Sequence, residues 1–356
     1  MKILIVKLSS IGDVVQTLPA LYALRKGFEK NGVKARIDWL VEEVASRVLS
    51  GNPLIDNVIV VRNRGWRTHL MENIKTARLL ASARYDMVLD FQGLFKSGVW
   101  VWLSKGKRRI GFSNARELSR IFFNEKLPPY DPDRHAVDRY LDLARYAGGL
   151  SGQAVFPIYT GLEEKKRVEG ILKDSGIAGQ GETGLHRWQP FFVIAARARW
   201  ATKEWKDDAL AEVAKAVTQA SGMRAVLVGG REDRAGLEGL KESIGSRAVN
   251  LAGLTTLKEL AALMKTASFV LTVDSGPMHI ASAVGAPTVA LFGPTAPWRT
   301  GPYGGCTPGS RKNIIIRKEL NCSPCFKKRC PDARCMKEIT AEEVIRAIEG
   351  LLNKDG

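Results

Sequence analysis

The segment FVLTVDSGPMHIASAVGAPTVALFGPT, residues 269–295, contains a strand, a helix and a second strand in succession. The first apolar strand ends at Val273, and residues 274–276 turn the chain into the helix. Pro277 then takes the first helical position, where proline is favoured because its missing N–H would have had no partner there. Two continuous apolar strands separated by one helix predict parallel strands covered on both faces.

The same alternation of short strands and longer helices occupies two halves of the chain. In the first half the expected strands are 3–8, 35–41, 57–61, 85–91 and 108–112, with helices near 17–30, 67–84, 94–103 and 135–147. In the second half they are 191–196, 224–230, 268–273 and 287–293, with helices near 206–220, 232–243, 257–266 and 277–284. This pattern predicts an α/β protein with two Rossmann-like domains whose parallel sheets face a central cleft.

The polar, glycine-bearing stretch within 150–190 marks the expected domain boundary. We expect an N-terminal Rossmann-like domain over 1–165 and a C-terminal one over 186–338. A closing helix within 339–356 can pack back on the N-terminal domain. A length of 356 residues suits two domains of ordinary size.

The charge balance points to an anionic partner. The chain has 54 Lys and Arg against 37 Asp and Glu, a net charge of +17, which favours nucleic acid, an acidic membrane surface or a phosphorylated substrate. Nucleic acid is disfavoured because the basic residues are scattered and form no known binding module. No apolar run reaches the roughly 18 residues of a membrane span, and Lys7 interrupts the N-terminal apolar run. We therefore expect a cytoplasmic protein with peripheral membrane contact only.

The opening strand runs into the loop SSIGD, which places a carboxylate at the start of a helix. Gly12 permits the tight turn, and Asp13 is open to two interpretations. It is either a helix cap, as Asp often is, or a general base that accepts a proton from a hydroxyl nucleophile. The loop has a single glycine where a dinucleotide-binding loop has G-x-G-x-x-G, which disfavours an NAD-dependent oxidoreductase.

Two loops of the second half suit a diphosphate. The helix that starts after Asp274 exposes free N–H groups and a positive dipole end, while Asp274 can accept hydrogen bonds from sugar hydroxyls and His279 can reach a phosphate or sugar. A simple cap with a buried histidine is the alternative. Lys203, in ARWATKEW, follows a strand at its carboxyl end, where it either neutralises phosphate or is an ordinary surface lysine.

Two further segments have no single interpretation. NCSPCFKKRCPDARCM places Cys322, Cys325, Cys330 and Cys335 at a C-x2-C-x4-C-x4-C spacing. These thiols could bind zinc, pack as a reduced loop in which the basic run 327–329 is what matters, or form disulfides. In 96–109, Trp100, Trp102 and Leu103 precede Lys105, Lys107, Arg108 and Arg109, which suits either a membrane interface or a core helix with a solvated basic turn.

Taken together, KLSSIGDVVQTLPAL, YDMVLDFQGLFKS, ARWATKEW, LAGLTTLKELAAL and DSGPMHIASAVGAPTVALFGPT resemble the lipopolysaccharide heptosyltransferases of glycosyltransferase family nine, over nearly the whole chain. The resemblance implies a GT-B fold in which the domain over 1–165 binds the acceptor and the domain over 186–338 binds the ADP-sugar. It also implies inverting transfer of heptose from ADP-L-glycero-D-manno-heptose, with no cofactor and no metal. NRGWR, DFQGLFKS, NAREL and RHAVDRY are most similar to type I members, which act on the Kdo region of lipid A. The cysteine segment is more similar to type II, so a transferase that adds a later core sugar is the alternative.

Site roles follow from the resemblance where the motifs match. Asp13 corresponds to the proposed catalytic base. The donor-binding positions are Gly12, Lys203, Thr255, Asp274, Ser275, Gly276 and His279. The acceptor-binding positions are Lys7, Arg62, Arg64, Arg67, Arg116 and His135. The implied partners are a nucleotide-sugar donor, an anionic lipid A-type acceptor and the cytoplasmic face of the inner membrane, without nucleic acid.

Overall fold

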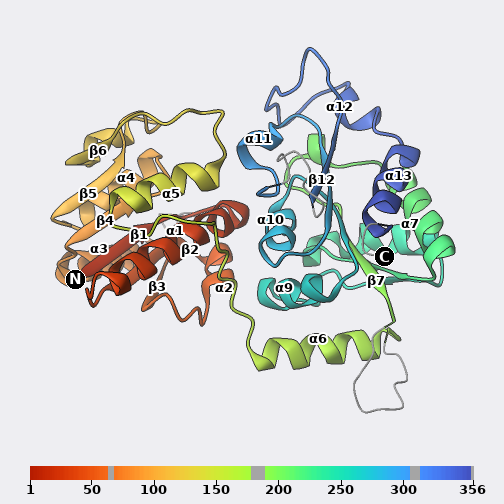
Figure 1. The fold of residues 1–356 in the computed structure, drawn as a ribbon, viewed down its shortest axis with the longest axis horizontal. Coiled ribbons are helices and arrows are strands. Elements are labelled where there is room, and N and C mark those ends of the chain that lie inside the picture. Colours follow the sequence, from red (N-terminus) through yellow and green to blue (C-terminus); the bar gives the residue numbers. More distant parts are fainter. Residues whose placement is uncertain (63–67, 178–188, 305–312, 354–356) are drawn as a thin grey trace. The chain divides into compact units, whose positions relative to one another are not determined.

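The computed structural model describes the chain except for residues 63–67, 178–188, 305–312 and 354–356 (Figure 1). The chain divides into two compact units, Met1–Tyr159 and Thr160–Gly356. Each unit is built around a six-stranded sheet in which every strand pair is parallel. The prediction of an α/β protein with two Rossmann-like domains is confirmed.

The sheet of the first unit has the order β3-β2-β1-β4-β5-β6. Its strands are β1 (Lys2–Val6), β2 (Arg36–Glu42), β3 (Asn57–Val61), β4 (Met87–Asp90), β5 (Arg108–Phe112) and β6 (Glu125–Leu127). Its helices are α1 (Ile11–Lys30), α2 (Glu43–Leu49), α3 (Leu70–Ala83), α4 (Phe95–Leu103), η1 (Ser119–Phe122) and α5 (Ala136–Tyr146). Residues 3–6 of the central strand β1 are fully buried, which explains their unbroken apolar run.

The sheet of the second unit has the order β12-β11-β10-β7-β8-β9. Its strands are β7 (Phe191–Ala195), β8 (Arg224–Leu227), β9 (Ala248–Asn250), β10 (Val270–Val273), β11 (Thr288–Phe292) and β12 (Asn313–Arg317). Its helical elements are α6 (Leu162–Asp174), η2 (Ala201–Lys203), α7 (Asp207–Ser221), η3 (Arg231–Asp233), α8 (Arg234–Ile244), α9 (Leu257–Thr266), α10 (Gly276–Ala283), α11 (Pro297–Thr300), α12 (Arg334–Lys337) and α13 (Ala341–Leu352). Counted from its own first strand, this sheet repeats the strand order of the first unit.

Strand order reverses once in each sheet, between β1 and β4 and between β7 and β10. In open parallel sheets, ligands bind beyond the carboxyl ends of the strands at such a switch point. The shared topology therefore directs attention to the loops after β1 and β4 in one unit and after β7 and β10 in the other.

Several elements differ from the sequence expectation. The first helix begins at Ile11 instead of near residue 17, because Ser10 and Asp13 form a capping box there. The short strands β6, β9 and β12 were not predicted; β6 and β9 have three residues each, and all three lie at or near sheet edges, where less apolar surface is buried.

The last described helix, α13, packs within the second unit. Helix α13 contacts α7 and β11, and Val344, Ile348 and Leu351 lie in the same apolar core as residues of β7, β8 and β11. The apolar face of this helix is therefore buried in the second unit, whereas the sequence allowed packing on the first domain. Among the described helices, none is both long and apolar enough to span a membrane.

Candidate functional site

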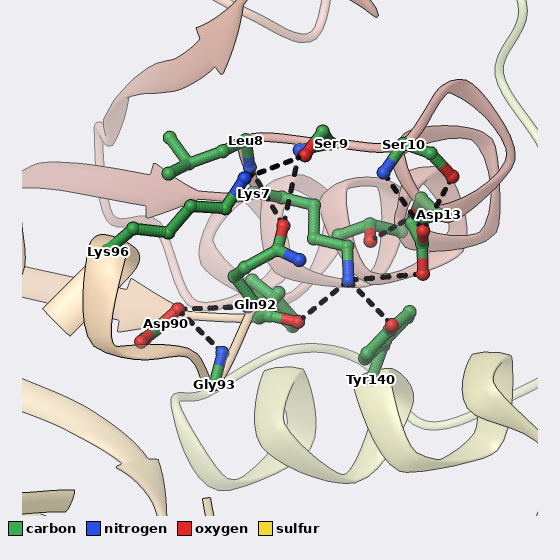
Figure 2. A network of polar contacts seen from close by, with 12 residues as sticks. Lys7, Leu8, Ser9, Ser10, Asp13, Asp90, Gln92, Gly93, Lys96 and Tyr140 are labelled. Atoms are coloured by element: carbon green, nitrogen blue, oxygen red, sulfur yellow. Dashed lines mark hydrogen bonds and ion pairs between the residues drawn. The ribbon is translucent and has the colours of Figure 1, made fainter. Parts of the chain in front are cut away.

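The loops after β1 and β4 meet through a connected set of polar contacts at the switch point of the first unit (Figure 2). Gln92 Oε1 accepts hydrogen bonds from the backbone N–H groups of Leu8 at 3.1 Å and Ser9 at 3.2 Å. Lys96 Nζ, from the first turn of α4, donates to Ser9 Oγ at 3.1 Å and to Glu42 Oε1 at 2.8 Å. The loop that leads to Asp13 is thus held by two side chains from the segment that follows β4.

Lys7 lies at the centre of this network, and its side chain is only 2% exposed. Its ammonium donates to the Phe91 carbonyl at 3.0 Å and to Tyr140 Oη at 2.7 Å, and lies 3.6 Å from Asp13 Oδ1 (Figure 2). Burial by itself would lower the pKa of Lys7, but Tyr140 and Asp13 outweigh it and raise the pKa. Lys7, which was expected to bind the acceptor, thus lies buried between Asp13, Phe91 and Tyr140.

Asp13 forms the helix cap that one interpretation of the sequence expected, and its side chain stays accessible, as the other interpretation requires. Its Oδ2 accepts from Ser10 N at 2.9 Å and from Ser10 Oγ at 2.7 Å, so it is the acidic partner of the capping box at the start of α1. Its side chain is nevertheless 37% exposed, with Oδ1 toward Lys7. Neighbouring Gly12 is buried in the first turn of α1. A carboxylate held from both sides yet open to solvent can accept a proton from a hydroxyl group.

Asp90 is a buried second carboxylate of this site, and the sequence interpretation gave it no role. Its Oδ1 accepts from the N–H groups of Gln92 and Gly93, and its Oδ2 accepts from Ser97 Oγ. Burial raises the pKa of Asp90 to about 6, against the opposing effect of these hydrogen bonds and of Lys7. Its signal in the sequence is its place near the end of the expected strand 85–91, at the start of the motif DFQGLFKS.

The candidate acceptor residues are less concentrated. Arg62 follows β3 and forms ion pairs with Glu43 at 3.0 Å and Glu72 at 3.3 Å. His135 caps α5, where its Nδ1 accepts from Val137 N. The Arg116 side chain is exposed, and its backbone N–H donates to Gly93 O. Arg64 and Arg67 lie outside the described residues.

The switch point of the second unit brings Lys203 and Asp274 together from the loops after β7 and β10. Lys203 Nζ lies 2.6 Å from Asp274 Oδ2, and Thr295 Oγ1 donates to the same oxygen at 2.6 Å. The Lys203 side chain is 17% exposed, and its ammonium lies 4.6 Å from the centroid of the Trp200 ring. Asp274 therefore holds Lys203 in position. The sequence had suggested only that Asp274 accepts hydrogen bonds from sugar hydroxyls. Thr295 was missed, although it follows the predicted strand 287–293.

The remaining donor candidates are grouped at helix starts. Ser275 is the N-cap residue of α10, and its buried Oγ has no hydrogen-bond partner in the described structure. Gly276 opens this helix, and His279 lies one turn further along. Thr255 precedes Thr256, the N-cap of α9. The N-terminus of α10 thus offers free N–H groups beside Lys203 and Asp274, which suits an anion.

The cysteine segment contains free thiols in the structure, with Cys335 buried and Cys322 and Cys330 exposed. Hydrogen bonds from the backbone N–H groups of Ala333 and Asp332 lower the pKa of Cys330. Over the described residues, these cysteines included, no group of three or more potential ligands is arranged to hold a metal ion.

Comparison with known proteins identifies the family. Residues 74–335 match glycosyltransferase family 9 (heptosyltransferase). The chain is 30% identical over 344 residues to lipopolysaccharide heptosyltransferase 1 of Pseudomonas aeruginosa, covering 93% of this chain and 87% of the relative.

Solved structures agree with this assignment. E. coli heptosyltransferase WaaC with ADP has a TM-score of 0.75 and 26% identity, covering 99% of this chain and 100% of that one. A glycosyltransferase family 9 protein from Veillonella parvula has a TM-score of 0.82 at 24% identity, covering 99% and 97%, and shares the fold. The resemblance found in the sequence is confirmed: the chain belongs to glycosyltransferase family 9, the heptosyltransferases.

Proposed function

We propose that this protein is a type I lipopolysaccharide heptosyltransferase, which moves heptose from ADP-L-glycero-D-manno-heptose to the Kdo region of lipid A. Membership of family 9 supports the reaction class. The name of the Pseudomonas aeruginosa relative supports type I, and the WaaC structure with ADP supports a nucleotide-linked donor. The net charge of +17 suits an acceptor rich in phosphate and carboxylate groups.

The observation that carries the chemistry is the Asp13 carboxylate, partly exposed at the switch point and anchored by Ser10 and Lys7. In a single displacement, the acceptor hydroxyl forms a bond to the anomeric carbon while the bond from that carbon to the nucleotide breaks. The hydroxyl proton passes to Asp13 as the oxygen attacks. Because Lys7 and Ser10 already fix the carboxylate, little reorganisation is needed at the moment of transfer.

On the leaving-group side, negative charge grows on the diphosphate of ADP. Lys203 and the N-terminus of α10 are the positive groups proposed to stabilise it. Ser275 Oγ, buried and without a partner in the described residues, is a donor available to a phosphate oxygen. Asp274 reduces the net charge of the pair but fixes the position of Lys203.

Peripheral contact with the inner membrane is also part of the proposal, but it rests partly on other residues than those first considered in 96–109. Trp100 is buried, and Lys107 and Arg108 pair with Asp86 and Glu125. The large apolar side chains that remain exposed are Phe95 and Trp102 on α4, Ile121 on η1 and Leu118 at the N-cap of η1. These neighbouring elements, near the exposed Arg116 and Arg120, suit an anionic interface. Equal partitioning to neutral and anionic vesicles would contradict electrostatic docking.

The decisive test is a transfer assay with ADP-heptose and a panel of truncated lipid A acceptors. We expect product with Kdo-lipid A that carries no heptose. Transfer only to acceptors that already carry one heptose would instead identify a type II enzyme. Absence of transfer to every member of the panel would contradict the proposed donor or reaction.

A further inference from the structure

The segment Cys322–Lys328 is fastened to both loops that form the donor candidate site of the second unit. Ser323 Oγ donates to Gly293 O at 2.7 Å, and the N–H groups of Cys325 and Phe326 donate to Pro294 O at 3.0 and 2.8 Å. These bonds hold it to the loop that carries Thr295, the residue bonded to Asp274.

A second attachment joins the segment to the loop after β7. Thr202 Oγ1, from a side chain that is buried, donates to Lys327 O at 2.9 Å. Thr202 directly precedes Lys203. Because Thr202 holds the carbonyl of Lys327, the backbone of the next residue, Lys328, is fixed beside the donor loops.

The anchored segment places a second ammonium group, that of Lys328, near the Trp200 ring, which the ammonium of Lys203 also contacts. Lys203 Nζ lies 4.6 Å and Lys328 Nζ 5.4 Å from the centroid of the partly buried Trp200 ring. Each contact is a favourable cation–π interaction. Two positive charges therefore lie near the same Trp200 side chain. They repel each other unless a bound anion offsets the repulsion.

The two lysines differ in whether a carboxylate balances their positive charge. Lys203 is paired with Asp274, whereas no carboxylate among the described residues forms an ion pair with Lys328. The group of Lys203, Asp274 and Lys328 therefore has an excess of one positive charge, next to the positive end of α10. A lone compensated pair would not provide this excess.

We propose that Lys328 is a second phosphate-binding residue for the nucleotide donor and acts with Lys203 on its diphosphate. This inference rests on the proposed function, and it assigns a binding role to the basic run 327–329. Lysine suits the task because it contacts phosphate oxygens as a point charge. The growing charge of the leaving diphosphate would relieve the repulsion between the two ammonium groups.

The test measures the affinities of ADP, AMP and adenosine by calorimetry for the full chain and three variants. Lys328→Met removes the charge and retains an apolar stem, and Lys328→Arg restores the charge. Lys327→Met is the matched control, because it changes the adjacent exposed lysine and preserves the backbone carbonyl that Thr202 binds. We expect Lys328→Met to weaken ADP binding about tenfold, the order expected for one hydrogen bond to a charged group.

The comparison of ADP, AMP and adenosine distinguishes direct binding of phosphate by Lys328 from an indirect effect of Lys328 on the loop. Adenosine affinity should be unchanged in Lys328→Met, AMP should lose less than ADP, and Lys328→Arg should restore most of the ADP affinity. Wild-type ADP binding in Lys328→Met, an equal loss for adenosine, or an equal effect of Lys327→Met would overturn the inference. Failure of the unaltered protein to bind ADP would overturn both this inference and the proposed donor, whereas binding that is insensitive to Lys328 would overturn the inference alone.

Discussion

Lys7 and Lys203 both follow the first strand of a sheet with the same strand order, Lys7 directly after β1 and Lys203 in η2 after β7. Both lie beside an aspartate at the switch point. Their surroundings differ: Lys7 is almost fully enclosed and bonded to Phe91 O and Tyr140 Oη, whereas Lys203 is partly exposed and lies over Trp200.

The difference shows how one topology supports two tasks. In the first unit the lysine is buried, and the aspartate, Asp13, is the more exposed partner. In the second unit the aspartate, Asp274, is the more buried partner, and the lysine is the more exposed one. An exposed carboxylate suits proton transfer, and an exposed ammonium suits a phosphate, so the burial pattern supports the two proposed roles.

The comparison is tested most strongly at Asp13. Asp13→Asn should lower turnover by roughly a hundred- to ten-thousand-fold, the range for loss of a general base, with ADP affinity unchanged. Steady-state kinetics and calorimetry measure the two quantities. Ser10→Ala is the matched control, because it removes one hydrogen bond of the capping box and keeps the carboxylate. Near-normal turnover in Asp13→Asn would leave only the capping role.

Removal of the buried lysine should affect stability first. Lys7→Met removes the buried ammonium that donates to Tyr140 Oη and lies 3.6 Å from Asp13, and we expect a loss of about 3–5 kcal/mol in the free energy of unfolding. Lys203→Met should cost less, because that ammonium is partly exposed and Thr295 still donates to Asp274. Urea denaturation of both variants provides the comparison. Equal losses would contradict the distinction between framework and ligand lysine.

The buried carboxylate next to Lys7 predicts a pH dependence. The pKa of Asp90 is raised from 3.8 to about 6, so the folded protein binds this proton more tightly than the unfolded chain. The stabilising contribution is complete below pH 3.8 and is lost as the pH rises through about 6. Relative to Asp90→Asn, the unfolding free energy should fall by roughly 3 kcal/mol across this interval. Parallel curves for the two proteins would contradict the assignment.

The smallest expected effect concerns donor affinity. Lys203→Met should weaken ADP binding by about ten- to a hundredfold, in line with 1.5–3 kcal/mol for a hydrogen bond to a charged group. The double variant Lys203→Met, Asp274→Asn removes the unpaired carboxylate and should recover stability but not affinity. Calorimetry and denaturation separate the two. Recovery of affinity in the double variant would show that Asp274, and not Lys203, controls the site.

The sequence by itself determined the fold class and the principal loops. Continuous apolar strands separated by helices require parallel sheets, because both faces must be covered. Turn chemistry at residues 274–276, and the carboxylate that follows the apolar run 3–6, were enough to locate both switch-point loops. Strand ends are readable because the change from apolar to polar residues is local in sequence.

Tertiary structure decided which of these side chains are available to a ligand. Tyr140 lies 133 residues from Lys7 in the sequence and accepts a hydrogen bond from its ammonium. Glu43 and Glu72 form ion pairs with Arg62. The residues of 321–328 reach the donor loops through backbone hydrogen bonds. Burial and ion pairing depend on contacts between segments far apart in the chain, so a lysine or arginine looks the same in sequence whether it supports the fold or binds substrate.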